Sequence, residues 1–181
     1  IKYKITNNTH QLDSQYPVLN FHLENDCDIE SITPYVTKFY NIKDFKVIIF
    51  KNNGIFNSKK SKRISYKKKL SGDTTFPNVI STEYVSIAKN STKKGKLRTL
   101  KKPHTFKFKT RKTLTAGDYS LLLLCRLNKG ASEGYVQIKE YHTLNHKDKY
   151  GTSTKCIGTA KPSVIYLETN NITSRSWFVD I

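Results

Sequence analysis

The 181-residue sequence has no methionine, a single tryptophan and only 14 acidic residues. No apolar stretch approaches the roughly 18 residues that a membrane-spanning helix needs, so we expect no transmembrane segment. Alanine and glutamate are scarce, whereas Asn, Ser, Thr, aromatic and β-branched residues are common, and this mixture favours strands and turns over helices. Because the chain starts at Ile1 and lacks methionine, we expect a processed product or a piece of a longer protein.

Motifs of the common enzyme classes are also missing. The sequence contains no Gly-x-Ser-x-Gly, no P-loop and no HExxH, and its five histidines are scattered. The few carboxylates form no evident pair for glycoside cleavage. Since no nucleophile, base and orienting group can be named, the sequence predicts a protein that is not an enzyme.

Three cysteines, Cys27, Cys125 and Cys156, show neither CxxC nor Cys/His spacing, which argues against a zinc site. Either two of them pair and the third stays free, or all three are small buried apolar residues. The position of Cys125 inside an apolar run favours burial. If a disulfide forms, we expect it between Cys125 and Cys156.

The stretch 103–127 carries the clearest strand pattern. Phe106 and Phe108 alternate with polar and basic residues, which is typical of a strand with one face on a core and one in water. Residues 115–118 then form a turn, in which Gly117 can adopt a positive φ without steric cost. The nearly all-apolar run 119–127 predicts a central strand covered on both faces. We expect the two strands to form a hairpin.

The remaining strands follow from similar patterns. In the range 18–24, Leu19, Phe21 and Leu23 are expected to face inward, and 44–51 reads as a buried strand. Pro34 pushes the strand at 29–39 toward a sheet edge, because proline cannot donate to a ladder. Further candidates lie at 84–87, 134–141, 163–168 and 176–181. With no repeat and no linker, residues 1–181 are predicted to form one all-β domain, an antiparallel two-sheet β-sandwich.

Two stretches are similar to a known class of module. CDIESITPYVTKFYNIKDFKVIIF, residues 27–50, and FKFKTRKTLTAGDYSLLLL, residues 106–124, resemble strands of jelly-roll modules in secreted adhesins, carbohydrate-binding modules and phage receptor-binding tail proteins. The second stretch carries the pattern through Leu114, Ala116, Gly117 and Tyr119. The resemblance implies a jelly-roll sandwich. The basic, loop-rich insert at about 57–102 departs from the common pattern.

The net charge of +18 is concentrated in the middle third, where residues 59–112 hold eighteen Lys and Arg against Asp73 and Glu83. We hypothesise that these cations meet on one side and bind a polyanion: an anionic wall polymer, an acidic glycan or nucleic acid. The alternative is a solvated lysine-rich surface that keeps the protein soluble, which the small share of arginine suits. The cations proposed to bind, with one interspersed tyrosine, are Lys59, Lys60, Lys62, Arg63, Tyr66, Lys67, Lys68, Lys69, Lys101, Lys102, Lys107, Lys109 and Arg111.

Exposed aromatic rings offer a second route to a glycan, because sugar rings pack their apolar faces on tyrosine and tryptophan. Tyr135 and Tyr141 are candidates because they share one face of a strand, although such a stripe also occurs in cores. Trp177 is expected in the core. Asp26 and Asp28 form part of an acidic turn that could hold a structural calcium ion, but turns favour Asp in any case. No other cofactor is expected.

Together these features predict a non-catalytic attachment module of a secreted adhesin or phage-type tail protein, which recognises a cell-surface glycan or anionic wall polymer. A nucleic-acid-binding domain that uses the basic middle third is an alternative, and so is a structural spacer or assembly domain in a larger particle. Three N-glycosylation patterns, at Asn7, Asn90 and Asn171, agree with export. We therefore expect an extracellular, cell-surface or virion location.

Overall fold

The computed structural model describes residues 2–6, 11–12, 17–23, 25–51, 64–65, 80–89, 93–142, 164–166, 175–177 and 179–180. Over these ranges the regular structure is entirely β and every strand pair is antiparallel, as the composition and the strand patterns predicted. The same residues contain no helix that is long and apolar enough to cross a membrane.

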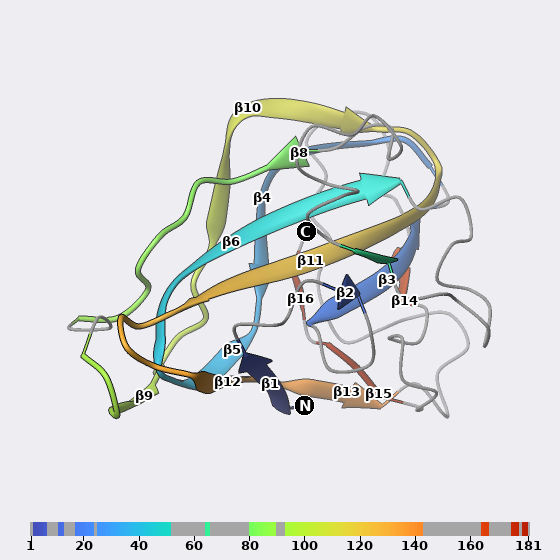
Figure 1. The fold of residues 1–181 in the computed structure, drawn as a ribbon. Helices are drawn as coiled ribbons and strands as arrows, with labels where there is room; N and C mark the ends of the chain where they lie inside the picture. Colours follow the sequence, from blue (N-terminus) through green and yellow to red (C-terminus); the bar gives the residue numbers. More distant parts are fainter. Residues whose placement is uncertain are drawn as a thin grey trace.

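One layer of the fold is a five-stranded sheet with β11 at its centre (Figure 1). The strand order is β14, β3, β11, β6, β8. The bounds are Val164–Tyr166 for β14, Val18–Leu23 for β3, Gly117–Leu127 for β11, Ile42–Lys51 for β6 and Ile80–Ser81 for β8.

The other layer combines a four-stranded sheet with a three-stranded one. The four-stranded sheet has the order β1 (Lys2–Thr6), β12 (Glu133–Ile138), β5 (Val36–Tyr40), β9 (Leu97–Thr99). The three-stranded sheet has the order β10 (Phe106–Leu114), β4 (Cys27–Pro34), β16 (Val179–Asp180). Two short pairs complete the described strands: β13 (Glu140–His142) with β15 (Arg175–Trp177), and β2 (Gln11–Leu12) with β7 (Ile64–Ser65). The two sheets adjoin at Tyr35, where β4 leads into β5, and the Tyr35 carbonyl accepts a hydrogen bond from the Lys139 N–H just after β12 at 2.8 Å.

The core lies between these layers. It is formed by apolar side chains that alternate with outward-facing residues along the strands. Leu19, Phe21 and Leu23 of β3 are fully buried, and Phe106 and Phe108 of β10 are buried between exposed lysines, so both predicted alternations are confirmed. Contact across the layers is direct, since the Phe39 ring meets the Phe45 ring edge-on at a centroid distance of 5.1 Å. The side chains 121–124 of β11 are at most 1% exposed, which confirms a central strand covered on both faces.

Trp177 is the largest fully buried side chain and anchors the C-terminal strands, as predicted. Its indole Nε1–H donates to the Tyr3 hydroxyl at 2.7 Å, and the two rings meet edge to face at 5.9 Å. The first and last parts of the chain are therefore joined through one buried polar contact, in which the indole N–H finds the partner that burial demands.

The hairpin predicted for β10 and β11 is wrong. β11 pairs with β3 along one edge and with β6 along the other, so neither edge is left for β10, which pairs with β4 in the opposite layer. The chain bends at Ala116, within the predicted turn, but residues 117 and 118 already belong to β11, and the bend carries the chain from one layer to the other. Gly117 takes a φ of 143° there, and the Ala116 N–H donates to an Asp26 carboxylate oxygen at 2.8 Å.

The prediction that Pro34 marks an edge strand is also wrong. β4 lies between β10 and β16, and Pro34 is paired with Val179. Proline is tolerated because Pro34 is the last residue of β4. The regular strand is interrupted at Tyr35, and β5 begins at the next residue. The sequence range 29–39 therefore contains parts of two strands that belong to two sheets.

The cysteine pairing differs from the expected one as well. Cys27, buried at the start of β4, takes part in a disulfide, whereas Cys125 is a free thiol. Cys156 lies outside the described residues. The expectation failed because it relied on the apolar surroundings of Cys125, and a partly buried position among apolar residues suits a free thiol equally well.

The free thiol of Cys125 is expected to react very slowly with iodoacetamide. Burial, and secondly the negative charge of Asp44, raise the pKa of Cys125, so the thiol stays protonated at neutral and mildly alkaline pH. We expect native protein at pH 8.5 to show less than about a tenth of the labelling at Cys125 that guanidinium-unfolded protein shows, measured by peptide mass spectrometry. Equal labelling in both states would contradict the burial of this thiol.

Candidate functional site

The outer face of the four-stranded sheet carries two rows of side chains. Residues directly opposite each other in paired strands share a face, and residues two apart along a strand do too. The first row runs across all four strands as Lys4, Tyr135, Tyr40 and Leu97. The second row runs beside it as Lys2, Gln137, Lys38 and Thr99. We call these two rows, with Glu133, the platform.

Alternation separates the platform from the core. On the same strands the intervening residues Tyr3, Val136 and Phe39 face inward and are at most 3% exposed. The platform lysines are exposed and its tyrosines are half-buried. Leu97, which is 48% exposed, is the only large hydrophobic side chain left open to solvent within the described ranges. Leu97 and the two half-buried tyrosine rings together present apolar surface to solvent on this face.

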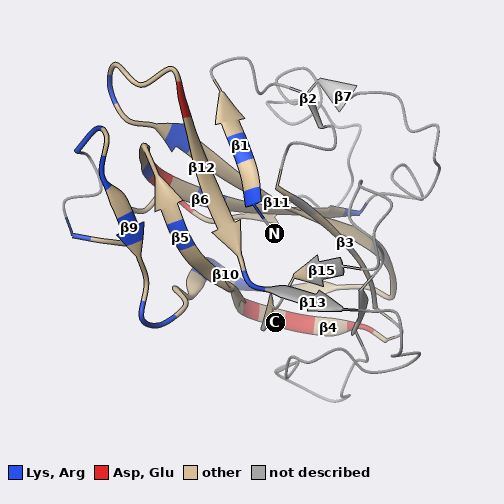
Figure 2. Cartoon of the chain, turned by 90° about the horizontal axis from the view of Figure 1, so that it is seen from below, with Lys and Arg blue, Asp and Glu red and all other residues tan. Residues whose placement is uncertain are grey.

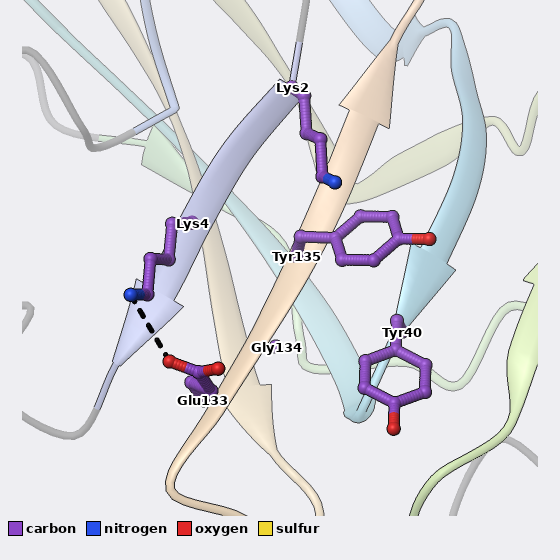
Figure 3. Close-up of a pocket in the computed structure, with 6 residues that line it drawn as sticks. All are labelled: Lys2, Lys4, Tyr40, Glu133, Gly134 and Tyr135. Atoms are coloured by element: carbon purple, nitrogen blue, oxygen red, sulfur yellow. Dashed lines mark ion pairs between the residues drawn. The ribbon is translucent and has the colours of Figure 1, made fainter.

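A pocket of about 390 Å³ lies on this face, lined by Lys2, Lys4, Tyr40, Glu133, Gly134 and Tyr135. The Tyr40 and Tyr135 rings are near parallel, with an interplanar angle of 23° and centroids 5.7 Å apart. Figure 3 shows the two rings side by side over the strands, with neither ring covering the other. They form a shallow apolar floor with hydroxyl groups at its rim, a surface suited to a flat ligand ring.

Charged groups border this floor on the β1 side. The Lys2 ammonium lies 4.0 Å from the centroid of the Tyr135 ring, a cation–π contact worth about 0.5–1 kcal/mol at an exposed site. Lys4 pairs with the Glu133 carboxylate at 3.1 Å, and both side chains are 62% exposed. Such an exposed ion pair contributes about 0–1 kcal/mol, so both partners can turn to a ligand at little cost.

Asn41 and Gly134 hold the strands of the platform at their ends. Asn41 adopts a left-handed φ of 57°, donates from Nδ2 to the Glu133 carbonyl at 3.1 Å and accepts a hydrogen bond from the Gly95 N–H. It therefore ties the start of β12 and the loop before β9 to the end of β5. At Gly134 a Cβ atom would lie 2.3 Å from the Tyr40 carbonyl oxygen, so only glycine lets β12 come this close to β5.

The predicted binding residues fall into different parts of the fold. Tyr135 lies at the centre of the platform. Lys101 and Lys102 are exposed in the connection after β9, and Lys107, Lys109 and Arg111 are exposed on β10. Figure 1 shows β10 at the opposite end of the molecule from β1 and β12. The structure therefore does not bring the cations of β10 together with Tyr135.

Acidic residues also neutralise part of the predicted cationic strand. Lys109 pairs with Glu83 at 3.1 Å and Arg111 pairs with Glu30 at 3.0 Å. Figure 2 shows Lys and Arg on β1, β5 and β9 and in the loops that flank β9, whereas Asp and Glu lie along β4. Since β4 neighbours β10, the surface around β10 is mixed in charge, and the positive surface extends over β9 and β5.

Several predicted residues cannot be placed. The side chain of Tyr141 and the residues Lys59, Lys60, Lys62, Arg63, Tyr66, Lys67, Lys68 and Lys69 lie outside the described residues. Their role in binding stays a prediction.

The carboxylates proposed for calcium make hydrogen bonds within the fold. Asp26 accepts from the Ala116 N–H, and Asp28 accepts from the Thr113 hydroxyl. Across the described part of the chain no group of three or more His, Cys, Asp or Glu side chains is placed to hold a metal ion.

Lys2, Lys4, Tyr40 and Leu97 were not identified from the sequence. The alternation of residues 2–5 does predict a strand with both lysines on its outer face, but it does not say which strand lies beside it. Only the registers of β1 with β12, β12 with β5 and β5 with β9 bring these side chains into one row.

Comparison of the chain with protein-family models, with curated proteins and with solved structures finds no match. The platform itself is therefore the basis for assigning a function.

Proposed function

We propose that this protein is a non-catalytic binding module that attaches to an anionic polymer, of the kind found in acidic cell-surface glycans and wall polymers, through the platform. The observation that supports this most is the pair of near-parallel tyrosine rings in a pocket bordered by Lys2 and Lys4. Aromatic faces bind the apolar faces of ligand rings, and the ammonium groups attract acidic substituents. We extend this proposal to a role as the attachment domain of an exported adhesin or of a phage-type tail protein, which such binding would serve.

Charge supports the same proposal. The paired positions of the platform hold three lysines, Lys2, Lys4 and Lys38, against one acid, Glu133. The positively charged strands and loops that continue over β9 extend this field beyond the pocket. A polyanion that lies on the platform would release counterions, so its affinity should fall steeply with salt.

The double substitution Lys2→Ala, Lys4→Ala is expected to weaken binding to polygalacturonate or heparin about tenfold at low salt and to flatten the dependence of affinity on salt. Tyr135→Ala should weaken binding by a similar factor while leaving the salt dependence almost unchanged, because the ring contributes stacking and no charge. Titration calorimetry at two salt concentrations measures both effects.

The matched control is Lys107→Ala, which removes an exposed lysine from β10, a strand of the three-stranded sheet that carries no platform residue. It should change the affinity less than twofold. If Lys107→Ala weakened binding more than the Lys2 and Lys4 double variant did, β10 and not the platform would be the binding surface. If the unmodified protein bound neither polymer, the proposed function itself would be wrong.

A further inference from the structure

The geometry points to a more specific ligand, and this inference rests on the proposed function: we infer that the platform binds an acidic oligosaccharide of at least three sugar units that lies across the four strands, from Lys4 to Leu97. Two features of the platform carry the inference. They are the continuation of the first row beyond the pocket and the presence of Glu133 beside it.

The first row is longer than the pocket. Lys4, Tyr135, Tyr40 and Leu97 are direct neighbours in successive strand pairs. Neighbouring strands lie about 4.8 Å apart, so the row crosses three intervals and spans about 14 Å. The pocket is lined from Lys4 to Tyr40 and does not include Leu97. A ligand confined to the pocket would leave the far end of the row without a function.

Leu97 extends the apolar floor to the β9 edge of the sheet. It follows Tyr40 in the row and exposes 48% of its surface, although the core of the fold buries nearly all other large aliphatic side chains that the structure describes. An exposed leucine next to two partly exposed tyrosines forms a continuous apolar strip. A chain of sugar rings is a ligand that can use such a strip unit by unit, because every ring offers an apolar face.

Glu133 suits a ligand that carries hydroxyl groups beside its acidic groups. Its carboxylate is 62% exposed at the border of the pocket and is paired there with Lys4. The same carboxylate can accept hydrogen bonds from sugar hydroxyl groups, and the amide of Gln137 in the second row can both donate and accept. A hexuronate unit satisfies both kinds of group, because it carries one carboxylate for a lysine and several hydroxyls for Glu133 and Gln137.

The test compares galacturonate oligomers of one to four units by titration calorimetry with the unmodified protein, Leu97→Thr and Leu97→Tyr. Threonine keeps the strand preference of β9 while it removes the apolar side chain, and the exposure of Leu97 makes either change compatible with folding. For the unmodified protein we expect the affinity to rise at least tenfold from the monomer to the trimer. Leu97→Thr should lower trimer affinity about fivefold without changing dimer affinity, and Leu97→Tyr should raise trimer affinity.

Ser81→Ala, on β8 of the other layer, is the control and should leave every affinity unchanged. If all oligomers bound equally well and Leu97→Thr had no effect, while Tyr135→Ala still weakened binding to polygalacturonate about tenfold, the extended row would be wrong and the proposed function would stand. If an eight-nucleotide oligo-dT bound more tightly than the trimer, in a manner sensitive to Tyr135, the assignment to a sugar would be overturned. Absence of binding to polygalacturonate and heparin alike would instead reject the proposed function.

Discussion

Gly134→Ala is expected to lower the free energy of unfolding by about 3 kcal/mol. The new Cβ atom would lie 2.3 Å from the Tyr40 carbonyl oxygen and 3.1 Å from both Asn41 Cβ and Leu127 Cδ2. The closest of these atoms belongs to the backbone, so a side-chain rotation cannot relieve the clash. β12 must therefore move away from β5, which weakens the pairing on which the platform depends. Urea denaturation measures the loss.

A substitution at a second glycine, Gly130, shows how much of the loss comes from the steric clash and how much a strained backbone conformation alone would cost. Gly130 has a φ of 80°, but the atom nearest to a methyl group added at this position, Lys94 Nζ, would be 3.9 Å away. Gly130→Ala should therefore cost only about 1–2 kcal/mol, the usual penalty for a left-handed alanine. If Gly134→Ala were no more destabilising than Gly130→Ala, the close approach of β12 to β5 would be contradicted.

Trp177→Ala is expected to be at least as damaging, with a loss of about 3–5 kcal/mol in the free energy of unfolding. The side chain is fully buried and is packed edge to face against Tyr3, so its removal leaves a large cavity. The variant should melt well below the unmodified protein in differential scanning calorimetry. A melting temperature within two or three degrees of the unmodified value, for a loss of about 1 kcal/mol or less, would contradict the buried position.

The hydrogen bond from the Trp177 indole to the Tyr3 hydroxyl can be separated from this packing by a double-mutant cycle. Tyr3→Phe should cost about 1–3 kcal/mol, because it leaves a buried N–H without an acceptor. Trp177→Phe removes the donor and part of the ring. The double variant should then be less destabilised than the sum of the two single variants, by about 1 kcal/mol. Strict additivity would show that the hydrogen bond contributes nothing.

The sequence predicted those features of the fold that depend on one strand at a time. Alternation identified the buried faces of β3 and β10, and the apolar run of β11 indicated a strand covered on both sides. The sequence did not predict which strands pair with one another. Nothing in the turn at residues 115–118 distinguishes a hairpin from a crossing between layers, because that choice is decided by β3 and β6 occupying both edges of β11.

The candidate site shows the same limit. Tyr135 could be named because it stands on a strand with an exposed face, but Tyr40 is the last residue of β5 and lies just beyond the predicted strand 29–39. Leu97 follows a run of basic residues and was counted as part of a basic connection. Each of these residues belongs to the candidate site only because of its partner in the neighbouring strand. The register of that pairing is set in the folded chain and cannot be read from one strand alone.

The central pairing of the fold sets the order in which the chain can become structured. β6 pairs with β11 from Lys51 opposite Tyr119 to Ile42 opposite Leu127, so every contact of this pair closes a loop of more than sixty residues. Contacts between residues this far apart in the sequence make folding slow. The entropic cost of closing such a loop rises only gradually with each added residue. During synthesis the middle of the five-stranded sheet cannot assemble until residue 127 has left the ribosome. An N-terminal fragment that stops before β11 should therefore remain unfolded, with the hydrophobic strand β6 open to aggregation until its neighbour arrives.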